Sequence, residues 1–585
     1  MRAILSVFVL LAYGVPCFSQ WSGNPAVNTP ICVASSFQDL PQLVSDGNGG
    51  AIIVWVDGRN PPINSNGDIY AQRIGANGFV QWTADGISVC GNGVTQNRPQ
   101  IVSDGNGGAI IVWEDLRNNI NANDIYAQRI NSSGVVQWVA NGVPVCTATA
   151  KQDRPMIATD GAGGAIITWY DYRNNSALAN IYAQRIDANG TALWTLNGIS
   201  VCPATINQID PKIIADGAGG AIVVWSDNRS NTQSDIYAQR IAGSGVITWS
   251  TSGLGICVLG RQQWAPSIAP DGSGGAIVAW ADQRDTISVP RTDDVYVQRV
   301  DSNGNRLWAA GGVPISTGAG NQMRPIVLSS GDGGAIISWN DTRNGSSNRD
   351  IYAQRVGSSG SIIWSANGIP ICTASNDQDW ANPISDGNGG AIISWEDERA
   401  GGTSRNVYAQ RVNANGAVQW TANGVATSTA SGYKSFSQIL PVGTGDAIIT
   451  WGDERSGSDD RNIYAQRINA NGSLTSVRFA EESPSSISLE QNYPNPFNPS
   501  TRIRFSVALG NGRRGESSDG LFSEEKVLLK VYDLLGREVA TLVNENLSAG
   551  SHHVQFNAQG LASGVYIYRL TAGTQSISKK LLLTK

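Results

Sequence analysis

Short runs of consecutive apolar residues, each preceded by a glycine-rich turn, recur along this chain. In the run Ala109–Trp113 every residue is apolar, which is typical of a strand buried on both faces. The turn Asp104–Gly108 comes directly before it, and its glycines adopt positive φ without steric cost. A polar box, Trp-x-Asp-x-Arg, ends the run with Trp113, Asp115 and Arg117. The pattern predicts a buried strand between a tight turn and a polar edge.

This box occurs eight times at a nearly constant interval of 55 to 59 residues. Its tryptophans are Trp55, Trp113, Trp169, Trp225, Trp280, Trp339, Trp395 and Trp451. A second box, with the consensus Ile-Tyr-Ala-Gln-Arg, follows each one, with tyrosines at Tyr70, Tyr126, Tyr182, Tyr237, Tyr296, Tyr352, Tyr408 and Tyr464. A fixed period of this length indicates a repeat architecture, in which each repeat is one supersecondary unit.

Each repeat contains four predicted strands. In the second repeat they are Gln100–Ser103, Ala109–Glu114, Asp124–Asn131 and Val135–Val139. A four-stranded sheet with two apolar faces cannot cover itself and has to stack on copies of itself. An open solenoid and a closed ring both satisfy this requirement.

The fourth strand also carries a recurring tryptophan, but the last repeat lacks one. The seven that are present are Trp82, Trp138, Trp194, Trp249, Trp308, Trp364 and Trp420. At the other end of the chain, Trp21 followed by Cys32 matches Trp82 followed by Cys90. We therefore expect the N-terminal strand to complete the last sheet, which removes the open edges of the array. The predicted fold is all-β, an eight-bladed β-propeller over residues 20–472.

The recurring polar residues are expected to support this frame. The eight box tryptophans should pack between blades, because each buries a large apolar surface. Asp115 and Arg117 are two residues apart and are expected to hydrogen-bond across strands near the blade edge, together with Arg129. The alternative is a ring of ligand-binding Asp/Arg pairs.

An aspartate opens six of the eight glycine turns and is expected to cap its turn. These residues are Asp46, Asp104, Asp160, Asp216, Asp271 and Asp386. Calcium binding at these turns is a weaker alternative, because the alternating oxygen ligands of a calcium loop are missing. No other cofactor and no other metal site is expected.

Six cysteines occupy one repeat position, and we interpret them as small buried apolar residues. They are Cys32, Cys90, Cys146, Cys202, Cys257 and Cys372. Disulfide or metal binding is the alternative for this set.

Charge and composition exclude some functions. The 585 residues carry a net charge of −6 without a basic stripe, so nucleic-acid binding is not expected. The only histidines are His552 and His553, near the C-terminus, so a Ser-His-Asp triad cannot form in the repeats. We name no catalytic residue. A carboxylate pair for glycoside cleavage is left open, because aspartate is abundant.

Differences among the repeats indicate where a ligand would bind. In each repeat, the loop between the second and third strands and the loop after the fourth strand vary. These two loops should share one face of the propeller, opposite the constant turns. Loops on a rigid frame commonly carry binding residues. Candidate ligand-binding residues in these loops are Trp264, Trp380, Phe37, Tyr433, Phe436 and Arg291. Aromatic rings among amides and hydroxyls suit a glycan or protein ligand. The alternatives are a polysaccharide-degrading enzyme, and a structural envelope component whose aromatics only pack. We expect a monomer.

The first 19 residues have the pattern of a secretory signal peptide. Arg2 supplies a positive charge, and the apolar run that follows, residues 4–13, is too short to span a membrane. Cleavage is expected between Ser19 and Gln20. No later stretch has the length and apolarity of a transmembrane helix.

After residue 472 the repeats stop. Residues 473–488 are predicted to be a polar linker. The strand-like runs that follow predict a small β-sandwich over residues 489–585.

The motifs of this segment resemble a known family, the type A C-terminal sorting domain of the type IX secretion system. They are Tyr493-Pro494-Asn495-Pro496, residues 531–537 (VYDLLGR), Leu561–Tyr566 with Gly564, and the terminal run ending at Lys585. The resemblance covers residues 487–585. It implies export across a Bacteroidetes-type envelope, the secretion machinery as partner, and a secreted or cell-surface protein.

Overall fold

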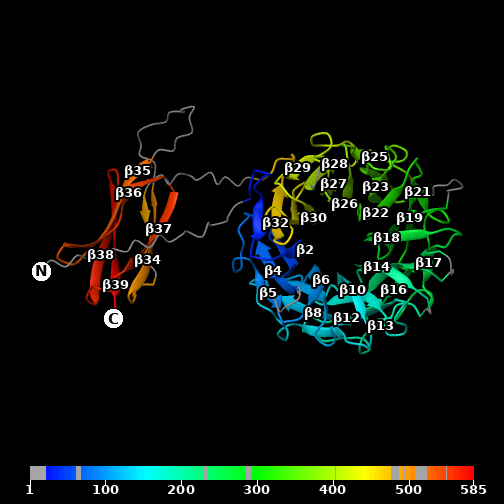
Figure 1. Ribbon diagram of the computed structural model, residues 1–585, viewed down its shortest axis with the longest axis horizontal. Helices are drawn as coiled ribbons and strands as arrows, with labels where there is room; N and C mark the ends of the chain where they lie inside the picture. Colours follow the sequence, from blue (N-terminus) through cyan, green and yellow to red (C-terminus); the bar gives the residue numbers. More distant parts are fainter. Residues whose placement is uncertain are drawn as a thin grey trace. The chain divides into compact units, whose positions relative to one another are not determined.

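The computed structural model describes residues 21–584, except 61–66, 204–205, 230–232, 285–291, 402–403, 476–486, 493, 508–523 and 549. The chain forms two compact units, residues 1–477 and 478–585. The first unit is a ring of eight four-stranded antiparallel sheets around a central opening (Figure 1). The predicted eight-bladed β-propeller is confirmed. Within the described part of the chain, no helix is long and apolar enough to cross a membrane.

Every blade has the same strand order, and its first strand lies next to the central opening (Figure 1). The inner strands are β2 (Gln38–Ser45), β6 (Gln96–Ser103), β10 (Gln152–Thr159), β14 (Gln208–Ala215), β18 (Gln263–Pro270), β22 (Gln322–Ser329), β26 (Gln378–Ser385) and β30 (Lys434–Pro441). The second strands are β3 (Ala51–Asp57), β7 (Ala109–Asp115), β11 (Ala165–Asp171), β15 (Ala221–Asp227), β19 (Ala276–Asp282), β23 (Ala335–Asp341), β27 (Ala391–Asp397) and β31 (Ala447–Asp453).

The third strands carry the second box, and the fourth strands form the rim of the ring. The third strands are β4 (Asp68–Ile74), β8 (Asp124–Ile130), β12 (Asn180–Ile186), β16 (Asp235–Ile241), β20 (Asp294–Val300), β24 (Asp350–Val356), β28 (Asn406–Val412) and β32 (Asn462–Ile468). The outer strands are β5 (Ile87–Cys90), β9 (Val143–Cys146), β13 (Ile199–Ser200), β17 (Leu254–Cys257), β21 (Val313–Ser316), β25 (Ile369–Cys372), β29 (Val425–Ser428) and, in the last blade, β1 (Thr29–Cys32).

The hydrophobic core lies between blades. One cluster joins Ile52 and Val54 of the first blade to Ile111 and Trp113 of the second, and the other propeller clusters also join neighbouring blades. All eight box tryptophans have no exposed surface. The second strand is therefore apolar at successive positions because each of its faces packs on a different neighbour.

The N-terminal strand closes the ring. β1 pairs with β32 in the last blade, and Trp21 is buried. The Trp21 indole donates a hydrogen bond to the carbonyl of Ala76 at 2.9 Å, as Trp82 does to Ser132 in the next pair of blades. Trp21 is therefore the eighth member of the tryptophan set that precedes the outer strand, as the sequence indicated.

The position predicted for the fourth strand is wrong. In the second blade this strand is Val143–Cys146, whereas the predicted segment, residues 135–139, makes only one bridge, Ile130 to Val136. The reason is the buried side chain of Gln128. Its amide donates to the carbonyl of Val139 and accepts the N–H of Trp138, so it takes the place of a neighbouring strand.

The expected partner of Arg129 is also wrong. Arg129 pairs with Asp104, the aspartate of the glycine turn, at 2.8 Å, and not with the box aspartate. It also donates to the carbonyl of Ala188, in the turn after β12 of the next blade. The equivalent bond from Arg467 to Ala76 joins the last blade to the first. These contacts bring the constant turns together on one face of the ring.

The C-terminal unit is a β-sandwich. One sheet has the order β33-β34-β37, formed by β33 (Ser488–Leu489), β34 (Ser500–Val507) and β37 (Gly550–Asn557). The other has the order β36-β35-β38-β39, formed by β36 (Glu538–Ser548), β35 (Glu524–Tyr532), β38 (Gly564–Ala572) and β39 (Gln575–Leu583). Alternate residues of both sheets fill one shared core, which confirms the predicted sandwich.

Candidate functional site at the mouth of the central channel

The Trp-x-Asp-x-Arg box is a closed network of side chains. Asp115 is fully buried and accepts hydrogen bonds from the Trp113 indole at 2.9 Å and from the Arg117 guanidinium at 2.6 and 2.9 Å. That guanidinium lies 3.7 Å from the centre of the Tyr126 ring and contacts the sulfur of Cys90 in the preceding blade. Its donors and acceptors are used within the protein, so the box has a structural role.

The cysteine position belongs to the same network. The six cysteines are buried and unpaired by disulfides, and each lies against the box of the next blade. Burial raises the pKa of the Cys90 thiol to about 12, so this side chain is a neutral packing group at physiological pH.

The inner strands, by contrast, carry a ring of irregular backbone. In the second blade this strand begins at Gln96, four residues earlier than the sequence predicted. Every inner strand contains a bulge where pairing with the second strand shifts. The third residue of each strand has a positive φ between 50° and 59°. These eight residues, here named the mouth ring, are Leu40, Arg98, Arg154, Asp210, Ala265, Arg324, Trp380 and Phe436. A proline follows six of them, which fits a strand whose other edge faces no partner strand.

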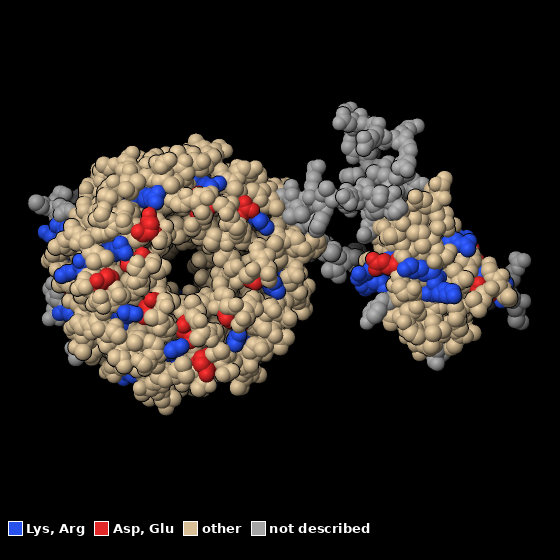
Figure 2. Space-filling view, turned by 180° about the vertical axis from the view of Figure 1, so that it is seen from behind, with Lys and Arg blue, Asp and Glu red and all other residues tan. Residues whose placement is uncertain are grey.

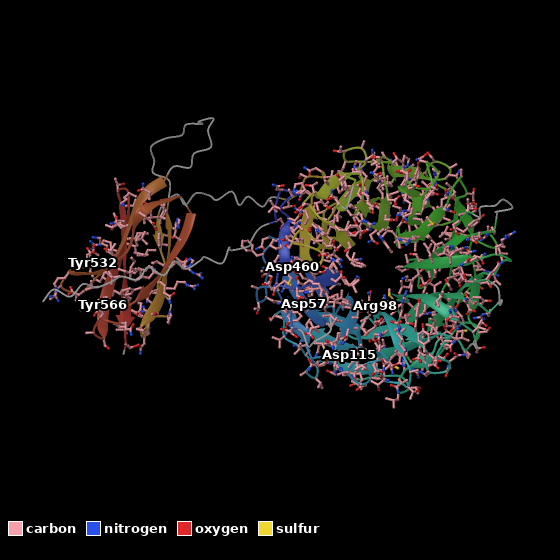
Figure 3. All side chains as sticks on the ribbon, viewed as in Figure 1. Asp57, Arg98, Asp115, Asp460, Tyr532 and Tyr566 are labelled. Atoms are coloured by element: carbon pink, nitrogen blue, oxygen red, sulfur yellow. The ribbon has the colours of Figure 1, made fainter. Side chains whose placement is uncertain are left out.

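None of the eight mouth-ring residues is glycine. A left-handed backbone is unfavourable for a residue with a Cβ, and this chain uses glycine at positive φ in its turns, for example Gly105 and Gly107. The eight mouth-ring positions hold six different residue types, whereas the residue two positions earlier is glutamine in seven of the eight blades. Backbone strain of this kind clusters at functional sites. Figure 3 places Arg98 at the edge of the central opening, while Asp57 and Asp115 lie farther out.

The mouth ring contributes to two pockets along the channel wall. The first has a volume of about 200 Å³ and includes Arg98, Arg154 and Asp210. The second has a volume of about 240 Å³ and includes Asp210, Arg324 and Trp380. Because both are lined by Asp210 and Lys212 of β14, they meet at the fourth blade. We refer to them as the polar pocket and the aromatic pocket.

The aromatic pocket brings together two tryptophans from blades five and seven. Trp380 is 49% exposed, and the guanidinium of Arg324 lies 4.0 Å above its ring. Trp264 is half-buried, and its indole donates to Asp293 at 2.9 Å, which fixes the ring against the wall. The amides Asn340 and Asn382 complete the polar lining. A concave surface with aromatic walls and a few oriented polar groups is typical of a ligand site.

The polar pocket has a tyrosine and an aspartate in direct contact. The Tyr170 hydroxyl donates to Asp210 at 2.9 Å and accepts the strained N–H of the same residue. Lys212 lies half-buried beside them, where burial lowers the pKa of its ammonium group and Asp210 partly opposes this shift. Arg154 is exposed, with its guanidinium 5.7 Å from the Tyr170 ring.

The residue between the tryptophan and the aspartate of the box varies among the repeats and can hydrogen-bond to the backbone of the mouth ring. In the second blade this residue is Glu114, which accepts the N–H of Arg154 at 2.7 Å and the Asn123 amide at 2.8 Å. Burial raises the pKa of Glu114 to about 8, and Asp153 adds to the shift. The sequence predicts only that Glu114 ends the second strand of its repeat.

This pKa predicts a pH dependence of stability. Above pH 4.5, its ordinary pKa, Glu114 loses its proton in the unfolded chain, but it keeps the proton in the folded protein until about pH 8. The folded state therefore loses stability as pH rises through this window, by up to about 1.4 kcal/mol per pH unit. Glu114→Gln should flatten that slope in urea titrations at pH 5, 6, 7 and 8. An unchanged slope would assign the titration to another group.

The other sequence candidates lie elsewhere. Phe436 belongs to the mouth ring and is 43% exposed, but it lines neither pocket. Phe37 packs partly buried in an inter-blade cluster. Tyr433 precedes β30, with the Arg405 guanidinium 4.6 Å from its ring centre. Arg291, Ser19 and Gln20 lie outside the described residues. The structure thus brings Trp264 and Trp380 together, and it places both in inner strands where the sequence predicted loops.

The sequence analysis missed Arg98, Arg154, Asp210 and Arg324. The signal was present: each lies between a repeated glutamine and a repeated proline, at a position where the copies differ. Charged residues of both signs surround the central opening on the face seen in Figure 2. Among the described residues, no group of three or more His, Cys, Asp or Glu side chains is placed to hold a metal ion.

The residues of the predicted sorting motif lie at the edge of the sandwich. Asn495 accepts the N–H of Leu582 at 2.8 Å, and the carbonyl of Pro494 accepts the Thr501 hydroxyl at 2.8 Å. Pro496 follows in the same turn, and Gly564 begins β38. The Tyr566 hydroxyl donates to Ala562 at 2.8 Å. Tyr493 and Lys585 lie outside the described residues.

Fold and motifs together define the chain as a β-propeller followed by a β-sandwich that directs export. Residues 491–584 match the family described as secretion system C-terminal sorting domain, which confirms the resemblance to the type IX sorting domain. The protein is therefore exported by the type IX route, with the secretion machinery as a partner, to the outside of the cell. The chain matches no curated protein sequence.

Solved structures with partial likeness have low identity. One is a protein of unknown function from Dyadobacter fermentans, with a TM-score of 0.33, 10% identity, and coverage of 54% of this chain and 94% of that one. Another is the alpha-L-arabinanase of Penicillium chrysogenum complexed with arabinobiose, with a TM-score of 0.33, 12% identity, and coverage of 57% and 97%. A third is a mutant of NanB sialidase from Streptococcus pneumoniae, with a TM-score of 0.32, 12% identity, and coverage of 77% and 71%.

Proposed function

We propose that the propeller is a carbohydrate-binding module, made with a signal peptide and exported to bind or adhere to glycans outside the cell. The observation that carries this proposal is the aromatic pocket, where Trp264 and Trp380 converge beside Asn340, Asn382 and Arg324. Indole rings stack on the apolar faces of sugars, while the Asn382 amide and the Arg324 guanidinium are accessible for hydrogen bonds to hydroxyl groups. The pocket, at about 240 Å³, is smaller than the roughly 300–1,000 Å³ typical of sites for drug-sized ligands. This size suits one unit of a longer glycan.

The rigid frame supports the same interpretation. The pocket walls come from inner strands that are held by buried ion pairs and packed tryptophans. A preorganised site loses less conformational entropy when it binds a ligand. The variable segment that precedes each inner strand in the sequence adjoins the mouth ring, which is the third residue of that strand, and would add contacts to a long glycan.

Trp380→Ala should weaken glycan binding by about 10- to 100-fold, because exposed tryptophans at the centre of a site contribute the most binding energy. Affinity would be measured by calorimetry of the full chain, with a glycan chosen from an array screen. Phe436→Ala is the matched control, since Phe436 has the same backbone position and similar exposure in the next blade but lines neither pocket.

Two outcomes would contradict the proposal. Equal losses in both variants would remove the aromatic pocket as the site. Release of reducing ends or unsaturated products from the bound polysaccharide would identify an enzyme instead of a binding module.

A further inference from the structure

Among the described basic side chains of the propeller, three of the five that lack an ion pair line the channel mouth. In the propeller, the box arginines pair with box aspartates and the second-box arginines pair with turn aspartates. Among the described residues, Arg154, Lys212 and Arg324 have no carboxylate within 4 Å, and all three line the two pockets. Arg261 and Arg306 also lack an ion pair, but they lie outside both pockets.

Arg98 adds a fourth cation with a weak partner. Within the described part of the chain, its one ion pair is a 3.4 Å contact with Glu114, and its side chain is 46% exposed. Because burial raises the pKa of Glu114 to about 8, that carboxyl is largely protonated at neutral pH and neutralises little of the Arg98 charge.

These four cations follow one another along the channel wall. Arg98 lies on β6, Arg154 on β10, Lys212 on β14 and Arg324 on β22. The two pockets that contain them share Lys212, so the cations line a continuous surface.

Acidic groups close to this surface are already engaged. Asp210, the only carboxylate that lines either pocket among the described residues, accepts the Tyr170 hydroxyl. Asp153 pairs with Lys151 at 2.6 Å, and Asp379 pairs with Arg349 at 2.9 Å. The pocket lining therefore combines three guanidinium groups and the Lys212 amine with one carboxylate, in a chain whose net charge is −6. Cations held together at some electrostatic cost are typical of a site for an anion.

We propose that the ligand is an acidic carbohydrate, with a sugar ring in the aromatic pocket and its carboxylate or sulfate groups on Arg98, Arg154, Lys212 and Arg324. This inference rests on the proposed glycan-binding function and names the ligand class of the same site. Guanidinium groups bind carboxylate and sulfate oxygens through paired N–H donors, and such charge-assisted bonds are stronger than neutral ones. Arg98, Arg154 and Lys212 lie on the neighbouring blades two, three and four, and Arg324 lies on blade six. Cations distributed along the wall in this way suit several charged units of one polymer.

The test compares polymers by calorimetry with the full chain. The probes are polygalacturonate, which carries carboxylates, dextran sulfate, which carries sulfates, and unmodified dextran. We expect at least one acidic polymer to bind at least tenfold more tightly than dextran, with an affinity that falls as NaCl rises from 50 to 300 mM. The acidic polymer that binds more tightly identifies the anionic group.

Substitutions localise the effect. Arg154→Gln and Arg324→Gln should each weaken binding of the acidic polymer about tenfold, whereas Arg261→Gln, which removes an unpaired charge elsewhere, should change it less than twofold. The side chains of Arg154 and Arg324 are exposed. Both variants should therefore fold, and thermal unfolding verifies this. Equal losses in all three variants would overturn the proposed site.

The remaining outcomes separate the two proposals. If dextran and the acidic polymers bind equally and Trp380→Ala weakens both, the carbohydrate function stands and the acidic ligand is wrong. Binding of none of the three polymers by a folded chain contradicts the acidic ligand, and failure across a wider glycan array contradicts the carbohydrate function too. Polyglutamate has carboxylates but no sugar, so equal affinity for it would mean that the site recognises charge alone.

Discussion

A chain that begins at Val33 should be less stable than one that begins at Trp21 by more than about 5 kcal/mol. The twelve lost residues include Trp21, Ile31 and Cys32, each no more than 2% exposed, and the whole of β1. Loss of one buried tryptophan side chain costs about 3–5 kcal/mol, and loss of an isoleucine about 2–5 kcal/mol. The edge of β32 would also lose its backbone partner.

Hydrogen bonds across the closure add to this effect. The carbonyl of Ser22 accepts the Gln466 amide at 2.6 Å, and the carbonyl of Val27 accepts Arg455 at 2.6 Å. Without these acceptors, both side chains would keep unsatisfied donors in a half-buried site, which costs more than an unmade surface bond. Urea unfolding followed by tryptophan fluorescence measures the difference.

Truncation at the other end is the matched control. Residues 478–585 form a separate compact unit, so a chain ending at Val477 should unfold its propeller at the same urea concentration as the full chain. A synthetic peptide of residues 21–32, added to the chain that begins at Val33, should restore part of the lost stability. Equal midpoints for the two N-terminal lengths would mean that β1 does not hold the ring closed.

The closure could be predicted because it depends on a residue count. Seven tryptophans ahead of the outer strand for eight repeats left one vacancy, and Trp21 followed by Cys32 had the residue order to fill it. The structure adds a physical reason for this match. Trp21 and Arg467 donate to the same carbonyl, that of Ala76, so the first and last repeats share one acceptor. At all the remaining junctions between blades, the equivalent tryptophan and arginine also share one carbonyl acceptor, for example Trp82 and Arg73 at Ser132.

The mouth ring could not be predicted in the same way. Its backbone has positive φ, but its residues include leucine, arginine and tryptophan, none of which signals that conformation. The predicted inner strand of the second repeat begins at Gln100, directly after Pro99, whereas the strand in the structure begins at Gln96. A proline is tolerated there because the inner strand has one free edge. The pockets follow from this bulge, which turns variable side chains toward the channel.

The Trp-x-Asp-x-Arg box differs from the mouth ring, because this conspicuous sequence motif has a structural role. The sequence left open whether the Asp/Arg pairs bind a ligand. In the structure the box aspartate bonds to the tryptophan and arginine of its own box, and the arginine reaches the preceding blade. The repeated part of each blade thus forms the frame, and the residue between Trp113 and Asp115, Glu114, links that frame to the mouth ring.

Asp115→Ala should destabilise the propeller by about 3–5 kcal/mol, the usual cost of removing one partner from a buried ion pair. Asp115 is fully buried, and it accepts one bond from Trp113 and three from Arg117. The substitution leaves the indole N–H without its acceptor and a largely buried guanidinium without its counterion. Asp301→Ala is the control, because Asp301 caps an exposed turn through the N–H groups of Asn303 and Asn305 and should cost about 1 kcal/mol or less. Both losses would be measured by urea unfolding at pH 7. If Asp115→Ala cost no more than Asp301→Ala but abolished glycan binding, the box would be a ligand site and its structural role would be wrong.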